Sequence, residues 1–151
     1  HDIDVCYEVT EVALRSLFAA LYDQNVMLEG TILKPSMVVS GKDCPEQASV
    51  DEVAEMTVRC LKNTVPATLA GIVFLSGGQS DESATANLNV MNTMGPHPWP
   101  LSFSYGRAMQ SAALKLWAAD TTRNFAAAQK IVAQRARENG LAALGRWTRA
   151  A

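Results

Sequence analysis

Residues 26–35, with the sequence VMLEGTILKP, carry the strongest fold signal in the chain. Pro35 has no backbone N–H and holds Lys34 in an extended conformation, so a strand through this run stops at Lys34. Apolar residues occupy both parities of residues 26–33, which predicts a strand covered on both faces, as in a parallel sheet. Because ligands of parallel α/β proteins bind at the C-terminal ends of strands, Lys34 is the first candidate for a functional side chain.

Helical and strand patterns alternate through the rest of the chain. Apolar spacing and capping residues predict helices at about 5–21, 50–61, 80–91, 106–117 and 122–144, and further strands at 71–75 and 101–105. This alternation requires parallel βαβ units with right-handed crossovers. Three strands make a small sheet, and the chain starts with a helix. The pattern therefore fits either a small α/β domain or part of a larger one.

Composition excludes several classes of protein. The chain has 151 residues, of which 48% are hydrophobic and 19% charged, as expected for one globular domain. A net charge of -2 provides no basic surface for nucleic acid or an anionic membrane. No apolar run reaches the roughly 20 residues of a membrane span. We therefore expect a cytoplasmic protein, with an organelle such as a plastid or glycosome left open.

Cysteine and histidine usage gives no sign of a metal site. The three cysteines, Cys6, Cys44 and Cys60, are odd in number and match no metal-ligand spacing. Only His1 and His97 could add imidazole ligands. We expect reduced thiols rather than disulfides, and no bound metal.

Each predicted strand ends in residues suited to chemistry, namely Lys34, Ser76-Gly77-Gly78 and Gly106-Arg107. Glycines leave backbone N–H groups accessible, and helix N-termini follow the two later strands, so both places favour an anion. Arg107 adds a guanidinium with the geometry for phosphate. An amine beside an anion site indicates a phosphorylated carbonyl substrate that forms a Schiff base. The amine must be neutral for that step, which apolar surroundings and Arg107 would favour.

Taken singly, each of these features has a more ordinary interpretation. A lysine at a strand end is more often a solvated or salt-bridged side chain. A Ser-Gly-Gly segment is most often a tight turn, and an arginine after a strand is usually a solvated charge. Their convergence at three strand ends favours a site but does not identify a substrate.

Three segments resemble the class I fructose-1,6-bisphosphate aldolase family. Residues 28–35 are similar to the family's Schiff-base lysine segment, residues 74–80 to its phosphate-binding loop, and residues 101–108 to its last barrel strand. The resemblance covers nearly the whole chain in the family's order. It implies an α/β fold that comprises the C-terminal three βα units of a TIM (β/α)8 barrel plus a C-terminal helix. Residues 1–151 would then be the C-terminal part of a single barrel domain.

The resemblance also implies a reaction and a set of site residues. Class I aldolases cleave fructose 1,6-bisphosphate to dihydroxyacetone phosphate and glyceraldehyde 3-phosphate in glycolysis, without a metal or other cofactor. By resemblance, Lys34 forms the imine with the ketose carbonyl. The residues implied to hold or surround a substrate phosphate are Ser76, Gly77, Gly78, Ser104, Gly106 and Arg107.

The chain departs from the family in what it lacks. Three strands cannot close a barrel, and the family's catalytic glutamate, its earlier aspartate and lysines, and its C-terminal tyrosine have no counterpart. We therefore expect little turnover from this chain alone and expect the missing N-terminal half of the barrel as a partner. The family further implies a homotetramer and cytoskeletal binding. Two alternatives stay open: a truncated non-enzymatic module for phosphate binding or assembly, and an independent phosphosugar-binding domain.

Overall fold

A three-stranded parallel sheet forms the centre of the computed structural model, which describes residues 1–149. The strands are β1 (Ile32–Leu33), β2 (Gly71–Phe74) and β3 (Leu101–Phe103), and they lie in the order β1-β2-β3. Each is followed by a helix, so the described residues contain the parallel βα units that the sequence predicts.

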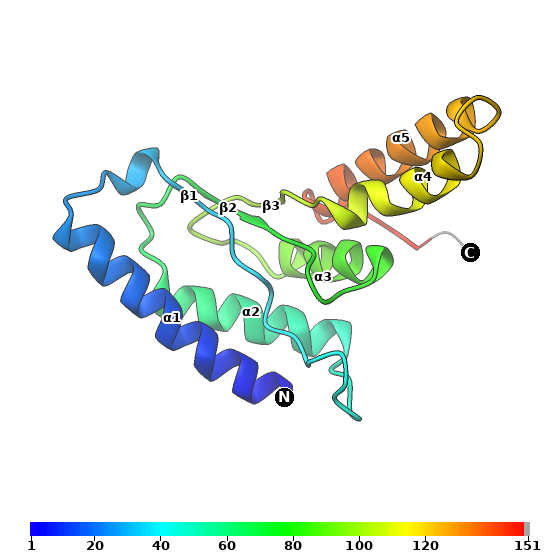
Figure 1. Ribbon diagram of the computed structural model, residues 1–151. Coiled ribbons are helices and arrows are strands. Elements are labelled where there is room, and N and C mark those ends of the chain that lie inside the picture. The colour runs from blue at the N-terminus through cyan, green and yellow to red at the C-terminus, as the bar shows by residue number, and fades with distance from the viewer. Residues whose placement is uncertain (150–151) are drawn as a thin grey trace.

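Five helices accompany the sheet within residues 1–149. They are α1 (Ile3–Asp23), α2 (Val50–Thr64), α3 (Asp81–Thr93), α4 (Arg107–Ala119) and α5 (Phe125–Ala142). Helices α1, α2 and α3 lie side by side below the strands, whereas α4 and α5 form a hairpin that extends away from the sheet (Figure 1). Helix α5 also packs against α3, which joins the base of this hairpin to the rest of the structure.

The two faces of the sheet differ in burial. Strand register pairs Leu33 with Ile72, and Ile72 with Leu101. These residues face the helices, and Ile72 is fully buried in the main hydrophobic core. The opposite face, which we call the open face, is exposed or half-buried. Its residues are Ile32, Lys34, Val73, Ser102 and Ser104.

The strand predicted over residues 26–33, covered on both faces, is wrong in length and in burial. Leu28–Gly30 forms a 3-10 turn, and only Ile32–Leu33 pairs with β2. This pair begins with Ile32 opposite Gly71, the first residue of β2, and Pro35, which has no N–H to donate, follows soon after its end. Ile32 is 60% exposed, because its side chain is on the open face and β1 is an edge strand of the sheet.

The other predicted elements are confirmed with small changes in their bounds. Ser49 and Glu52 form a capping box at the start of α2, and the Ser80 hydroxyl caps α3. Helix α5 passes through Gly140 and continues to Ala142. All three cysteines, Cys6, Cys44 and Cys60, are free thiols. No helix within residues 1–149 is long and apolar enough to cross a membrane.

Candidate functional site

The C-terminal ends of the three strands lie beside one another at a single edge of the sheet. The Leu75 N–H donates to the Pro35 carbonyl at 3.0 Å, and the Ser104 N–H donates to the Phe74 carbonyl at 2.9 Å. Backbone pairing thus continues past the strands and brings the residues after each one into lateral contact. The predicted convergence of three strand ends is confirmed.

Lys34 and Ser104 both lie on the open face of this edge. In the register of the sheet, their parity is that of Val73 rather than that of the core residue Ile72. Both side chains are exposed. The apolar surroundings predicted for Lys34 are therefore not found among residues 1–149, because the open face has no covering layer there.

A tight turn follows β2, and hydrogen bonds join it to α4 and to α3. The buried Ser76 hydroxyl accepts from the Ala108 N–H at 3.3 Å, so it ties this turn to the first turn of α4. The Gln79 N–H donates to the Ser76 carbonyl at 3.3 Å, and the Asn87 side-chain amide donates to Gln79 Oε1 at 2.8 Å. Gly78 closes the turn with a φ of +80°, a conformation that favours glycine.

Gly77 and Arg107 lie close together although they follow different strands. A Cβ atom placed on Gly77 would lie 3.5 Å from Nη2 of Arg107 and 3.0 Å from Cδ1 of Leu75. The Arg107 guanidinium therefore lies beside the Gly77 backbone, at the distance of an ordinary van der Waals contact from an added Cβ. Arg107 is exposed, so its donors are accessible to a ligand.

The N-terminus of α4 is the least neutralised of those that follow the strands. Helices α2 and α3 are capped by serine side chains and carry acidic residues in their first turns. Helix α4 starts after Gly106, has no side-chain cap and has no acidic residue in its first turn. Its first residue is Arg107. The helix dipole and the guanidinium therefore both favour an anion at this position.

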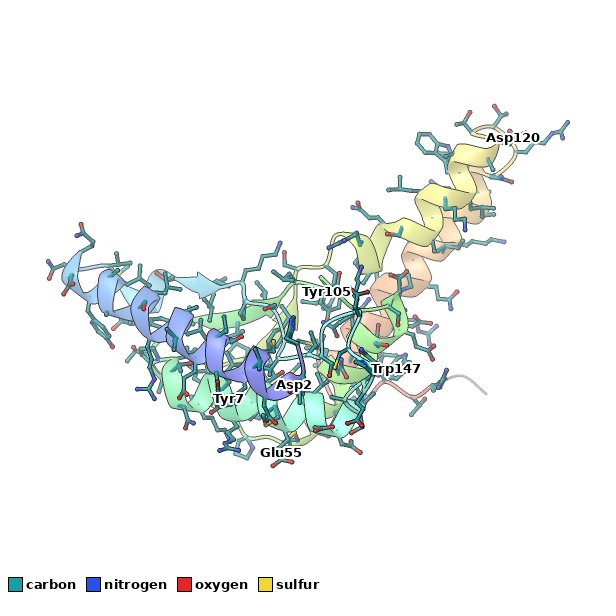
Figure 2. The ribbon with its side chains drawn as sticks, turned by 60° about the horizontal axis from the view of Figure 1, so that its bottom comes forward. Asp2, Tyr7, Glu55, Tyr105, Asp120 and Trp147 are labelled. Atoms are coloured by element: carbon teal, nitrogen blue, oxygen red, sulfur yellow. The ribbon has the colours of Figure 1, made fainter. Side chains whose placement is uncertain are left out.

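Tyr105 links the end of β3 to α3. Its buried hydroxyl donates to the Ala84 carbonyl at 2.9 Å, and Figure 2 shows it where the sheet passes into the α4–α5 hairpin. Burial raises the pKa of Tyr105, and the nearby Arg135 guanidinium opposes that rise only in part. The tyrosine therefore stays protonated and keeps its hydrogen bond.

Ser76, Gly77 and Arg107 lie close together, as the convergence of the strand ends predicts, but the sequence did not show which of them faces inward. Ser76 turns inward and holds α4, whereas Arg107 and the Gly77 backbone face outward. No sequence pattern distinguished Tyr105 or Arg135 from an ordinary tyrosine or arginine. Both act through backbone carbonyls of distant helices, and a carbonyl group is common to every residue type.

Comparisons with known proteins agree with this geometry. The family model for fructose-bisphosphate aldolase class-I matches residues 1–151. The chain belongs to the class I fructose-bisphosphate aldolase family. Its three βα units and final helix are the C-terminal portion of the TIM barrel of class I aldolases.

Individual aldolases show how much of the family's length is present. The chain is 73% identical to the probable fructose-bisphosphate aldolase class 1 of Xanthomonas axonopodis pv. citri, over 97% of this chain and 44% of the relative. It is 57% identical to fructose-bisphosphate aldolase 1 of Toxoplasma gondii, over 97% of this chain and 40% of that aldolase. The chain thus spans less than half the length of these relatives.

A solved aldolase superimposes on nearly the whole chain. The aldolase from Plasmodium falciparum, in a ternary crystal structure with TRAP and a small-molecule inhibitor, has a TM-score of 0.94 and is 47% identical. The match covers 99% of this chain and 43% of that one. This agreement extends to the α4–α5 hairpin, whose placement the element pattern of the sequence did not predict.

Proposed function

We propose that this chain carries the imine-forming lysine and the phosphate-binding loop of an enzyme that cleaves fructose 1,6-bisphosphate, and that residues 1–151 are the C-terminal part of one barrel domain. The observation that carries the proposal is the geometry of the strand ends. Lys34 lies on the open face at the same edge where Gly77 and Arg107 approach each other. An amine and an anion site are thereby offered to one phosphorylated ketose.

The proposed chemistry assigns a role to each group. The Lys34 amine attacks the ketose carbonyl carbon, and loss of water gives a protonated imine that takes up the electron pair of the breaking carbon–carbon bond. Backbone N–H groups at Gly77 and at the start of α4, together with Arg107, hold a substrate phosphate. Ser104, the residue that follows β3, lines the same space. Covering the open face by the rest of a barrel would remove Lys34 from water and favour its neutral form.

Efficient turnover needs more than these residues. The family's proton-transfer carboxylates have no counterpart in this chain, and loss of a general acid or base typically lowers the rate by about 10²–10⁴-fold. We therefore expect little cleavage by the 151-residue chain alone.

A complementation assay tests the proposal. Fructose 1,6-bisphosphate cleavage is measured for the chain alone and after mixing with the part of the Xanthomonas relative that the chain does not match. We expect the mixture to be at least about 100-fold faster, and Lys34→Arg in this chain to abolish the gain. Equal rates for the chain alone and the mixture, or full activity of Lys34→Arg, would refute the assignment.

Assembly and partners are part of the same proposal. The Plasmodium relative was solved in a complex with TRAP, so we propose that a protein partner can also bind this aldolase. Homotetramer formation and cytoskeletal binding stay predictions from the family.

A further inference from the structure

Arg135 of α5 joins the first turns of two other helices. Its Nε donates to the Ala108 carbonyl at 3.0 Å, and its Nη2 donates to the Asp81 carbonyl at 2.7 Å. Asp81 is the first residue of α3, and Ala108 is the second residue of α4. One planar guanidinium therefore sets the distance between the starts of two helices that follow neighbouring strands.

Surrounding groups hold this guanidinium in a single orientation. The fully buried Thr85 hydroxyl accepts from Nη2 of Arg135 at 2.7 Å and contacts Asn139 Oδ1 at 2.8 Å. Glu138 forms an ion pair with Nη1, and the Arg135 side chain is only 12% exposed. With its charge paired and its donors used, Arg135 is engaged in these contacts and is not free to bind a ligand.

We propose that Arg135 is a positioning residue for the phosphate site, where it sets the spacing between the first turns of α3 and α4. This role rests on the proposed function, because the turn at Ser76–Gly78 leads into α3, and Arg107 begins α4. Ala108 joins the two contacts: its N–H donates to the Ser76 hydroxyl, and its carbonyl accepts from Nε of Arg135. A shift of Arg135 moves the anion donors without touching the anion.

Substitution by lysine separates geometry from charge. In Arg135→Lys the charge is kept, but a single ammonium lacks the fork that reaches both carbonyls. We expect the Kd for inorganic phosphate, measured by NMR titration of the complete 151-residue chain, to rise roughly tenfold. The matched control is Arg137→Lys, two residues further along the same helix and exposed, for which the Kd should stay within about twofold of the unsubstituted value.

The readouts distinguish positioning from general stabilisation. A residue that only stabilises the fold would lower the Tm without phosphate and leave the Kd of the folded chain unchanged. A wild-type Kd in folded Arg135→Lys therefore overturns the positioning role and leaves the phosphate site standing. Absence of phosphate binding by the unsubstituted chain overturns the phosphate site and, with it, this role.

A second variant covers the case in which Arg135→Lys does not fold. Thr85→Val removes the hydroxyl that accepts from Nη2 and keeps the shape of the side chain. It should raise the phosphate Kd in the same direction, by a smaller factor. An unchanged Kd in folded Thr85→Val also contradicts the positioning role.

Discussion

Two neighbouring glycines follow β2, and they differ in backbone conformation and in surroundings. Gly78 has a φ of +80° and open space around it, so a side chain there would cost backbone strain alone. At Gly77 an added Cβ would lie 3.0 Å from Cδ1 of Leu75 and in ordinary contact with the Arg107 guanidinium, so only the Leu75 side chain would have to shift. Gly78 is therefore the position at which the turn requires glycine.

Alanine at Gly78 should destabilise the fold by about 1 kcal/mol, because a non-glycine residue at positive φ is strained. Alanine at Gly106 is the control, since its φ of -87° suits any residue and nothing lies within 4 Å of the added Cβ. Denaturant unfolding of both variants measures the difference. Equal free energies of unfolding for the two variants would show that the turn relaxes without strain.

Cys60 should be the least reactive of the three thiols at neutral pH. Burial, and to a smaller extent the Glu11 carboxylate, disfavour the thiolate and raise the pKa of Cys60 from 9.0 to about 11. Only the thiolate reacts with iodoacetamide, so the raised pKa slows the labelling. We expect its labelling rate in the folded chain to climb until the pH passes about 11. Mass spectrometry of the labelled peptides, with half-buried Cys44 as the internal reference, measures the rate. Equal labelling of the two at pH 8 would contradict this.

The same shift predicts how stability depends on pH. The unfolded chain releases the Cys60 proton near pH 9.0, and the folded chain releases it near 11. Between these values the folded state binds more protons, so the free energy of unfolding falls as the pH rises. Below pH 9 this contribution is fully present. Cys60→Ala should flatten the decline over this range.

At the scale of single elements, sequence patterns predicted the sheet better at β2 and β3 than at β1. In β2 and β3, the residues that pair with a neighbouring strand belong to the apolar runs seen in the sequence. Residues 26–33 contain a similar run, but pairing decides the extent of a strand, and only Ile32 and Leu33 of this run pair with β2. Local composition does not contain that information.

The same limit applies to the candidate site. Lys34 and the Gly77 turn were predictable because proline and glycine mark strand ends locally. Arg135 was not, since its contacts with Asp81 and Ala108 join residues 54 and 27 positions apart. An arginine on a helix looks the same in the sequence whether it binds water or two carbonyls.

Removing the hydroxyl of Tyr105 tests the link between β3 and α3. Tyr105→Phe should lower the free energy of unfolding by about 1 kcal/mol, because the Ala84 carbonyl loses a buried hydrogen bond. Denaturant unfolding measures it, with Tyr22→Phe as the control at an exposed position. A loss of stability no larger than that of Tyr22→Phe would show that packing, rather than the hydrogen bond, holds this contact.

At the scale of the whole molecule, large apolar surfaces lie uncovered within residues 1–149. A groove of about 710 Å³ runs between α4 and α5, the hairpin that extends from the sheet in Figure 1. Exposed Leu114, Trp117, Phe125 and Val132 line it. The outer edges of β1 and β3 pair with no further strand of the described chain. Such edges and grooves favour association with other chains.

We therefore expect the chain alone to self-associate as its concentration rises. Analytical ultracentrifugation across a concentration series measures the mass. Ile32→Lys, which places a charge on the edge strand at a side chain that is already 60% exposed, should weaken the association without unfolding the chain. A monomer at every concentration would contradict the expectation.

Borohydride trapping with dihydroxyacetone phosphate tests directly whether Lys34 forms the proposed imine. The chain is treated alone and after mixing with the unmatched part of the Xanthomonas relative, and the modified lysines are located by peptide mass analysis. We expect Lys34 to be labelled in preference to the exposed Lys42 and Lys62, and Arg107→Gln to reduce the labelling. Absence of label at Lys34 in both samples, or equal label at all three lysines, would contradict it.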